Sequence, residues 1–189
     1  MDTGPGNIYT EASFRAGGLH NDYSTSDLRD AMGRSARGYD TYSPYYGIHA
    51  GLGYIWKFTE QASVDLYAKY FWTRMQGSHV RLAIGDPVTF KDMDSHRLRL
   101  GGRFNYAFND HVSTYIGAAW EYEMDGCARG TTYGYSINTP TMYGSTGLGE
   151  LGLTLKPSKD LPLSFDLGVQ GYVGKREGVT GSLQIRYEF

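Results

Sequence analysis

The feature that most constrains this chain is a strict alternation of apolar and polar residues, repeated in segments of about ten residues, the length of a membrane-spanning strand. The last segment shows it clearly. Its apolar positions are Val179, Leu183, Ile185, Tyr187 and Phe189. The polar positions between them are Thr180, Ser182, Gln184, Arg186 and Glu188. Successive side chains of a β-strand point to opposite faces, so this pattern predicts a strand with one apolar and one polar face.

The same alternation predicts eight strands, at residues 8–19, 45–58, 62–73, 96–108, 112–123, 143–155, 163–173 and 179–189. Short connectors at 59–61, 109–111 and 157–162 alternate with long polar segments at 20–44, 74–95 and 124–142 and a shorter loop at 174–177. Outer-membrane barrels combine short periplasmic turns with long extracellular loops. We therefore expect an all-β fold, an antiparallel up-and-down transmembrane β-barrel of eight strands. Because open strand edges are not tolerated in hydrocarbon, its first strand should pair with its last, with both termini in the periplasm.

Aromatic residues gather at both ends of the predicted apolar faces. Beside the short turns lie Trp56, Phe58, Phe104, Phe108, Phe165, Tyr187 and Phe189, and beside the long loops lie Tyr46, Trp72, Trp120, Tyr122 and Tyr143. The middles of the same faces are aliphatic, as at Leu66, Leu98, Ile116 and Leu153. This distribution matches the two interfaces and the core of a bilayer, and the girdle is predicted above all at Trp56, Phe58, Trp72, Phe108, Trp120 and Tyr122. The alternative is a soluble barrel of the lipocalin type, whose apolar faces point inward.

Length and composition are consistent with this architecture. The 189 residues predict a single domain spanning 1–189, with residues 1–6 as an artificial start or a linker. No apolar run is long enough for a transmembrane helix, and no signal peptide is recognisable at Met1. The 17 tyrosines and 26 glycines suit aromatic girdles and closely packed strands. The net charge of −2 argues against a nucleic-acid partner, and Cys127, the single cysteine, excludes an internal disulfide.

The polar faces carry charges of both signs on neighbouring strands. Arg99 and Arg103 should face Glu121 and, across the lumen, Glu150, which predicts a polar network inside the barrel. Two interpretations remain open. The network is either a plug of mutually neutralising side chains, or a wall that contacts a segment or helix threaded through the lumen.

One cluster has the composition of a metal site. Asp92, Asp94 and His96 place two carboxylates and an imidazole along one extended segment and form a weak candidate for a divalent cation. The simpler interpretation is a solvated loop end. Serine and histidine near the outer rim do not define a catalytic arrangement, so we expect neither an enzyme nor a bound cofactor.

Several stretches resemble the β-domain of autotransporters, the type V secretion proteins. They are SPYYGIHAGLGYIWK at residues 43–57, DSHRLRLGGR at 94–103, YIGAAWE at 115–121, and the last strand through Phe189. The resemblance implies a twelve-stranded outer-membrane barrel with a helix in its lumen and an exported N-terminal passenger. This chain is similar to the last eight strands and contains neither helix nor passenger.

The resemblance also implies roles for particular residues and partners. Leu183, Ile185, Tyr187 and Phe189 resemble the signal that the outer-membrane assembly machinery reads, and Arg99, Arg103, Glu121 and Glu150 resemble residues that line the family's pore. The expected function is an outer-membrane anchor and translocator unit, here a C-terminal fragment without passenger or lumen helix. Its expected partners are outer-membrane lipid, lipopolysaccharide, the assembly machinery and, at full length, a passenger segment. The alternative is a small structural or adhesive barrel that binds through its extracellular loops.

Overall fold

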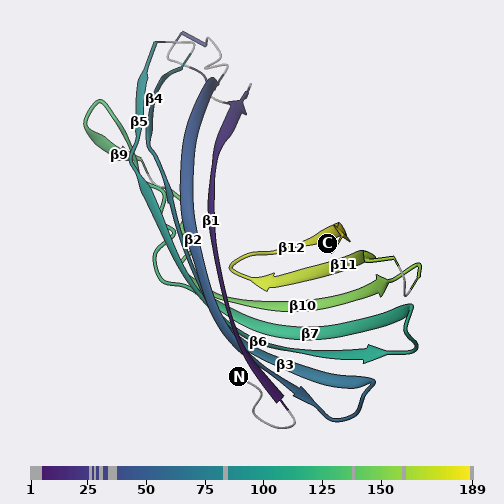
Figure 1. The fold of residues 1–189 in the computed structure, drawn as a ribbon. Coiled ribbons are helices and arrows are strands. Elements are labelled where there is room, and N and C mark those ends of the chain that lie inside the picture. Colours follow the sequence, from purple (N-terminus) through teal and green to yellow (C-terminus); the bar gives the residue numbers. More distant parts are fainter. Residues whose placement is uncertain are drawn as a thin grey trace.

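A computed structural model describes residues 6–25, 27, 29, 32–33, 38–82, 85–137, 139–158 and 161–187. The described chain is antiparallel and all-β, as predicted. Its main sheet has eight strands in the order β1-β2-β3-β6-β7-β10-β11-β12 (Figure 1). They are β1 (Gly6–Tyr23), β2 (Tyr39–Lys57), β3 (Ala62–Met75), β6 (Met93–Ala107), β7 (Val112–Glu123), β10 (Gly144–Leu155), β11 (Leu163–Gly174) and β12 (Gly178–Tyr187).

Each predicted strand corresponds to one strand of this sheet, and the up-and-down order is confirmed. The largest differences in length are in β1 and β2, which stay paired as far as Tyr23 and Tyr39. The polar residues of these outer ends do not interrupt pairing, because a ladder of backbone hydrogen bonds needs no apolar face. Strands of this length exceed the apolar thickness of a bilayer, so we expect one end of the β1–β2 pair to extend beyond it.

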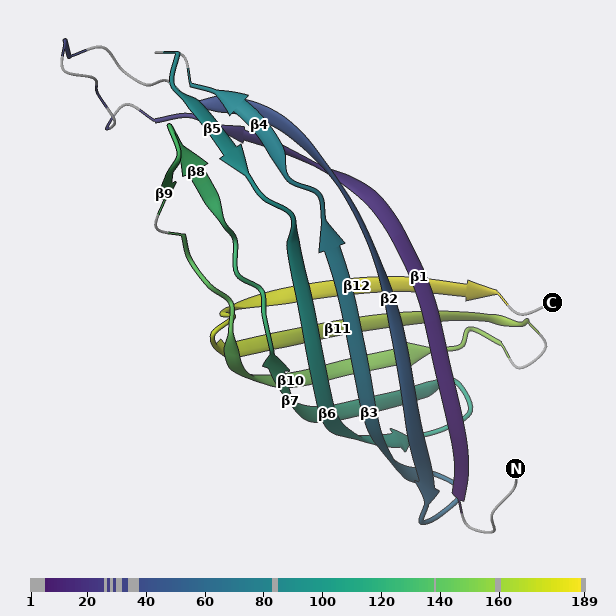
Figure 2. The same cartoon turned by 90° about the vertical axis from the view of Figure 1, so that its left-hand side faces the viewer.

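The segments expected to be long loops contain a second, smaller sheet, which the alternation did not predict. Its order is β4-β5-β8-β9, with β4 (Ser78–Arg81), β5 (Pro87–Phe90), β8 (Gly130–Thr132) and β9 (Tyr135–Ile137). These strands are three or four residues long, too short to show a clear alternation. Figure 2 shows this sheet standing beside the long outer ends of β1 and β2.

The two faces of the main sheet are inverted relative to a soluble protein. Ile116 is 60% exposed and Phe14 is 70% exposed, whereas Glu121 is 1% exposed. Only three apolar side chains of the described residues are buried, Val80, Val88 and Leu148, and the first two belong to the small sheet. The apolar face is therefore the outer one, which is the opposite of a lipocalin-type barrel and suits a surrounding of lipid.

The predicted closure of the first strand on the last is not found among the described residues. β1 pairs with β2, β12 pairs with β11, and the sheet ends at these two edges. Every described residue of β12 is exposed. Closing a barrel requires strand tilt and stagger to accumulate until the two edges meet, and eight strands produce only a curled half-barrel here (Figure 1).

Candidate functional site: the polar wall of the lumen

The concave face of the curled sheet brings together side chains from strands that are not neighbours. Tyr9 on β1 donates its hydroxyl to Asp65 on β3 at 2.9 Å, across β2. Lys69 on β3 likewise contacts Glu11 on β1, with Nζ 2.6 Å from Oε1. Contacts across an intervening strand require a face that curves inward. We call this concave polar surface the lumen wall.

The structure brings the four predicted lumen residues together in two ion pairs. Arg99 donates to Glu121, with Nη2 2.8 Å from Oε2. Arg103 donates to Glu150 through two nitrogens, at 2.8 and 2.9 Å. Glu150 does not lie across the lumen as expected, because β10 is two strands from β6 in the same wall. Two-point pairing of this kind fixes both side chains in the wall.

Glu121 is the centre of a larger cluster near the outer end of the wall. Arg99 and Arg176 approach its carboxylate at 2.8 and 2.6 Å, and Arg97 lies at 3.6 Å. The neighbouring Glu123 accepts from the Ser95 hydroxyl at 2.6 Å and is 3.9 Å from Nε of Arg97. A carboxylate that is almost fully buried is stable only when cations and donors compensate for its lost hydration.

A second polar cluster of the wall lies between β1, β2 and β3. Glu11 contacts both Lys69 and His49, whose Nε2 is 3.3 Å away. The His49 ring stacks on Phe71, with ring centroids 4.6 Å apart. His49 was not predicted as a wall residue, although its position within the alternation of β2 places it on the same face as Gly47 and Gly51.

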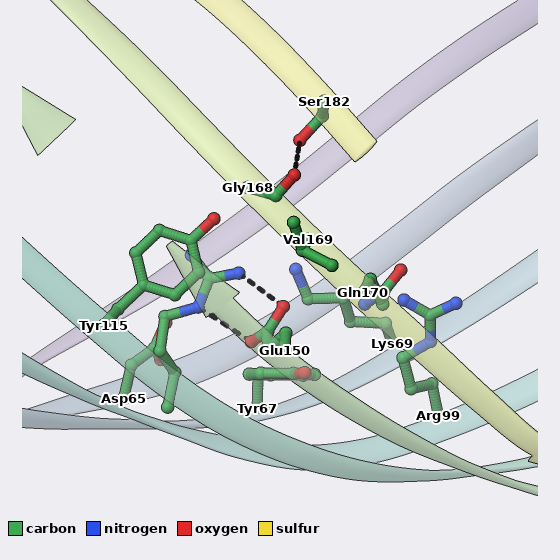
Figure 3. Close-up of a pocket in the computed structure, with 11 residues that line it drawn as sticks. Asp65, Tyr67, Lys69, Arg99, Tyr115, Glu150, Gly168, Val169, Gln170 and Ser182 are labelled. Atoms are coloured by element: carbon green, nitrogen blue, oxygen red, sulfur yellow. Dashed lines mark hydrogen bonds and ion pairs between the residues drawn. The ribbon is translucent and has the colours of Figure 1, made fainter. Parts of the chain in front are cut away.

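Part of the lumen wall surrounds a polar cavity of about 270 Å³, drawn in Figure 3. Its lining comes from both halves of the sheet, from Asp65, Tyr67 and Lys69 on β3 to Ser182 on β12. Glycines make room for large rings in the wall. A side chain at Gly152 would collide with the ring of Tyr115, and one at Gly101 would collide with Tyr67. The space of the lumen is therefore shaped by ring-over-glycine packing as well as by charge.

The candidate metal ligands lie outside the lumen, and the structure does not bring them together as a ligand set. Arg74 binds Asp92 and Asp94 at 2.7 and 3.2 Å, and the Nδ1 atom of His96 is 2.7 Å from the Tyr70 hydroxyl. Within the described ranges, no group of three histidine, cysteine or acidic side chains is placed to hold a metal ion. The Gly77 N–H and the Arg74 guanidinium lower the pKa of Asp92 below its usual value, so the cluster is an ion pair that anchors a loop.

The predicted girdle residues lie on the outer face. Trp56, Phe58, Phe108 and Trp120 are exposed there, and Trp120 stacks with Tyr122 at 5.7 Å. Trp72 lies near the C-terminal end of β3 and donates its indole N–H to Asp94 at 3.2 Å. Of the predicted assembly signal, Leu183, Ile185 and Tyr187 form the exposed apolar stripe of β12, and Phe189 lies outside the described residues.

Arg176, like His49, is a wall residue that sequence analysis missed. It lies in the loop between β11 and β12, where no alternation assigns it to a face. Only the return of this loop over the wall brings its guanidinium to Glu121 and its backbone N–H to the Thr146 hydroxyl, at 2.6 and 3.2 Å. No pattern in the sequence could have assigned an arginine of this short loop to the lumen wall.

Comparison with known proteins identifies one family. The model of the family described as "Autotransporter beta-domain" matches residues 2–168 of this chain. A search of curated proteins returned no match. The described part of the chain contains no helix that is long and apolar enough to span a membrane.

Proposed function

This chain belongs to the autotransporter beta-domain family of the bacterial outer membrane, and on that premise we propose that it is the membrane anchor and translocator unit of a larger secreted protein. The observation that carries the proposal is the two-sided sheet. Its outer face is apolar with aromatic ends, and its inner face is a wall of ion pairs around a polar cavity. An apolar exterior suits lipid, and a polar concave interior suits a hydrated passage for polypeptide.

The open edges of β1 and β12 support a barrel that is completed by further strands. An unpaired row of backbone N–H and C=O groups costs several kcal/mol per group in hydrocarbon, so neither edge can face lipid. We propose that additional strands of the same protein pair with both edges and close the lumen, so that this chain forms the C-terminal part of the barrel. It contains no catalytic or cofactor site in this proposal.

The orientation follows from the connectors. The first residue of β1, Gly6, pairs with Trp56 beside the short turn after β2, and Tyr187 of β12 pairs with Leu163 beside the short turn before β11. The first residue of β1 and the last residue of β12 therefore both lie on the side of the sheet that carries the short turns. We propose that this side is periplasmic and that the small sheet β4-β5-β8-β9 is extracellular, since periplasmic turns are the short ones.

The exposed apolar stripe of β12 supports a contact with the outer-membrane assembly machinery before the barrel closes, and the outer face supports contact with lipid and lipopolysaccharide afterwards. Deletion of Phe189 tests the first contact. We expect a large loss of outer-membrane yield and only a modest loss of stability in detergent, at most about 1.5–3 kcal/mol for one buried side chain. Equal losses in both measurements would reduce Phe189 to a structural role.

The experiment that tests the translocator function uses the full-length protein in intact cells. Protease added outside should remove the segment upstream of the β-domain and leave the membrane-embedded strands intact. A matched control uses permeabilised cells, in which both sides of the membrane are accessible. The proposal fails if the β-domain is embedded but the upstream segment is cleaved only after permeabilisation.

A second function, adhesion through the extracellular region, is favoured by exposed tyrosines on and around the small sheet. Tyr42, Tyr133 and Tyr135 are 63%, 66% and 77% exposed. Rings exposed on a scaffold of paired strands can contact a ligand with little loss of conformational entropy. Saturable binding to a surface that disappears when the β8–β9 hairpin is replaced by a glycine-serine turn would support this function. Unchanged binding would exclude the hairpin from it.

A further inference from the structure

A second cavity lies away from the short turns, where β4 and β5 stand beside the outer ends of β1 and β2 (Figure 2). Its volume is about 150 Å³. Pockets for drug-sized ligands measure about 300–1,000 Å³, so this one suits a ligand of about one ring. The register of β1 with β2 is continuous along β1, which places Asn21 and its partner Thr41 on the same face as Glu11. The cavity therefore lies on the concave side of the sheet and not on the side of the lipid.

The polar side chains of this cavity have unused hydrogen-bonding groups. They are Asn21, Thr41, Ser43, Gln76 and Ser78. Among the described residues, none of these side chains forms a hydrogen bond. Ser43 is the most constrained of them, because only 6% of it is exposed. A buried polar group without a partner costs free energy, which a ligand or water in the cavity can recover.

The rest of the lining combines aromatic rings with cations. Tyr39 and Phe90 contact each other, with ring centroids 5.5 Å apart. Lys91 and Arg129 are neighbours, since the Lys91 N–H donates to the Arg129 carbonyl at 2.9 Å. Both side chains are exposed, and neither forms an ion pair with a described residue. The described lining contains no aspartate or glutamate, and the neighbouring Asp92 is already bonded to an arginine of β3.

We infer that this cavity binds an acidic saccharide, a sugar ring that carries a carboxylate. Each part of such a ligand has a counterpart in the lining. Amide and hydroxyl side chains exchange hydrogen bonds with the sugar hydroxyls, and the two aromatic rings pack against the apolar face of the sugar. Lys91 and Arg129 bind the carboxylate and select an acidic sugar over a neutral one. The inference rests on the proposed adhesive function and orientation, and it names the chemical class of the ligand.

The test measures binding of three small probes to the full-length protein in detergent, by saturation-transfer NMR. The probes are glucuronate, its neutral counterpart glucose, and acetate, which is a carboxylate without a ring. We expect glucuronate to bind at least about tenfold more tightly than either, the effect of one charge-assisted hydrogen bond or of the contacts of the ring. Equal binding of glucuronate and glucose, or of glucuronate and acetate, overturns the inference.

Two substitutions test whether the sugar lies in this cavity. Arg129→Gln should weaken glucuronate binding about tenfold and leave glucose binding unchanged, because it removes a partner of the carboxylate alone. Ser43→Ala should weaken both sugars about twofold to tenfold, the effect of one neutral hydrogen bond. The matched controls are Arg81→Gln and Ser136→Ala, which change the small sheet outside the cavity lining and should leave binding unchanged. An equal loss in a variant and its control overturns the inference. Arg129 is exposed, so its variant keeps the test decisive if Ser43→Ala does not fold.

Competition with purified lipopolysaccharide identifies the source of the sugar. Displacement of glucuronate supports a sugar acid of the cell's own outer leaflet, and no displacement supports a glycan on another surface. The hairpin replacement in cells separates failure of this site from failure of the adhesive function. If cells lose saturable binding with the β8–β9 hairpin but the purified protein does not prefer glucuronate, adhesion stands and the acidic-sugar site fails. If the protein prefers glucuronate but cells bind no surface, the site stands and adhesion fails.

Discussion

A single arginine placed on either face of the same sheet measures directly which face meets lipid. Leu151 on β10 is 57% exposed and belongs to the apolar outer face. Gln170 on β11 pairs with Glu150 and lines the lumen cavity, at almost the same depth. Leu151→Arg and Gln170→Arg therefore add the same side chain at the same level of the membrane, on opposite faces.

The expected loss of stability in Leu151→Arg depends on the depth of this residue in the membrane. Leu151 lies four residues before the end of β10 at Leu155. With a rise of about 3.4 Å per residue and a tilt of about 45°, it is about 10 Å from that end along the membrane normal. This is close to the middle of an apolar band about 25 Å tall, where a lipid-facing arginine costs about 2–4 kcal/mol. Gln170→Arg should cost much less, because its guanidinium remains in the hydrated lumen near Glu150.

The measurement is reversible unfolding of the full-length protein in liposomes, followed by tryptophan fluorescence over a denaturant gradient. Leu151→Arg should reduce the folding equilibrium constant by about 30-fold to 700-fold, the equivalent of 2–4 kcal/mol. The lumen variant serves as the internal control for the loss of packing and the gain of charge. Equal costs on the two faces, or a larger cost at Gln170, would refute the assignment of the apolar face to lipid.

Three further outcomes are expected. Arg103→Gln and Glu150→Gln should each destabilise the protein by about 1–3 kcal/mol, because each leaves a charged partner unpaired, and the double variant should cost less than the sum in a denaturant double-mutant cycle. Gly152→Ala should cost about 1–3 kcal/mol through overpacking against the tyrosine ring that covers it, whereas Gly149→Ala, which meets nothing within 4 Å, should be nearly neutral in the same assay. Asp92 has a lowered pKa in the folded protein. Its contribution to stability is therefore present at neutral pH and disappears as the pH falls through that lowered value. Proteolysis of the adjoining segment between β5 and β6 should therefore accelerate only at strongly acidic pH, and Asp92→Asn should remove this dependence.

Most of the architecture was encoded locally. The period-two alternation identified all eight strands of the main sheet and the face of each, because a strand exposes its two sides independently of its neighbours. It also placed Arg99 and Arg103 on the same face as Glu121 and Glu150, and the distribution of Trp56, Trp72 and Trp120 predicted the membrane interfaces. The match of the autotransporter beta-domain to residues 2–168 confirmed the resemblance found in the motifs.

The remaining features depended on the curvature of the whole sheet. Pairing between Tyr9 and Asp65, or between Arg103 and Glu150, skips a strand and arises only when the sheet bends around its polar face. The convergence of Arg176 on Glu121 depends on the path of a loop, which has no periodic signal.

Closure was the feature that alternation could not decide. A strand pattern determines faces and neighbours along the chain, but whether β1 meets β12 depends on the tilt and stagger accumulated over the entire sheet. The sequence pattern did not predict the four short strands of the small sheet for a related reason. β4, β5, β8 and β9 are stabilised by pairing between two segments that are separate in the sequence. The sequence by itself thus determined the strands, their faces and the family, and the tertiary structure alone determined the open edges, the cluster of arginines around Glu121 and the shape of the lumen wall.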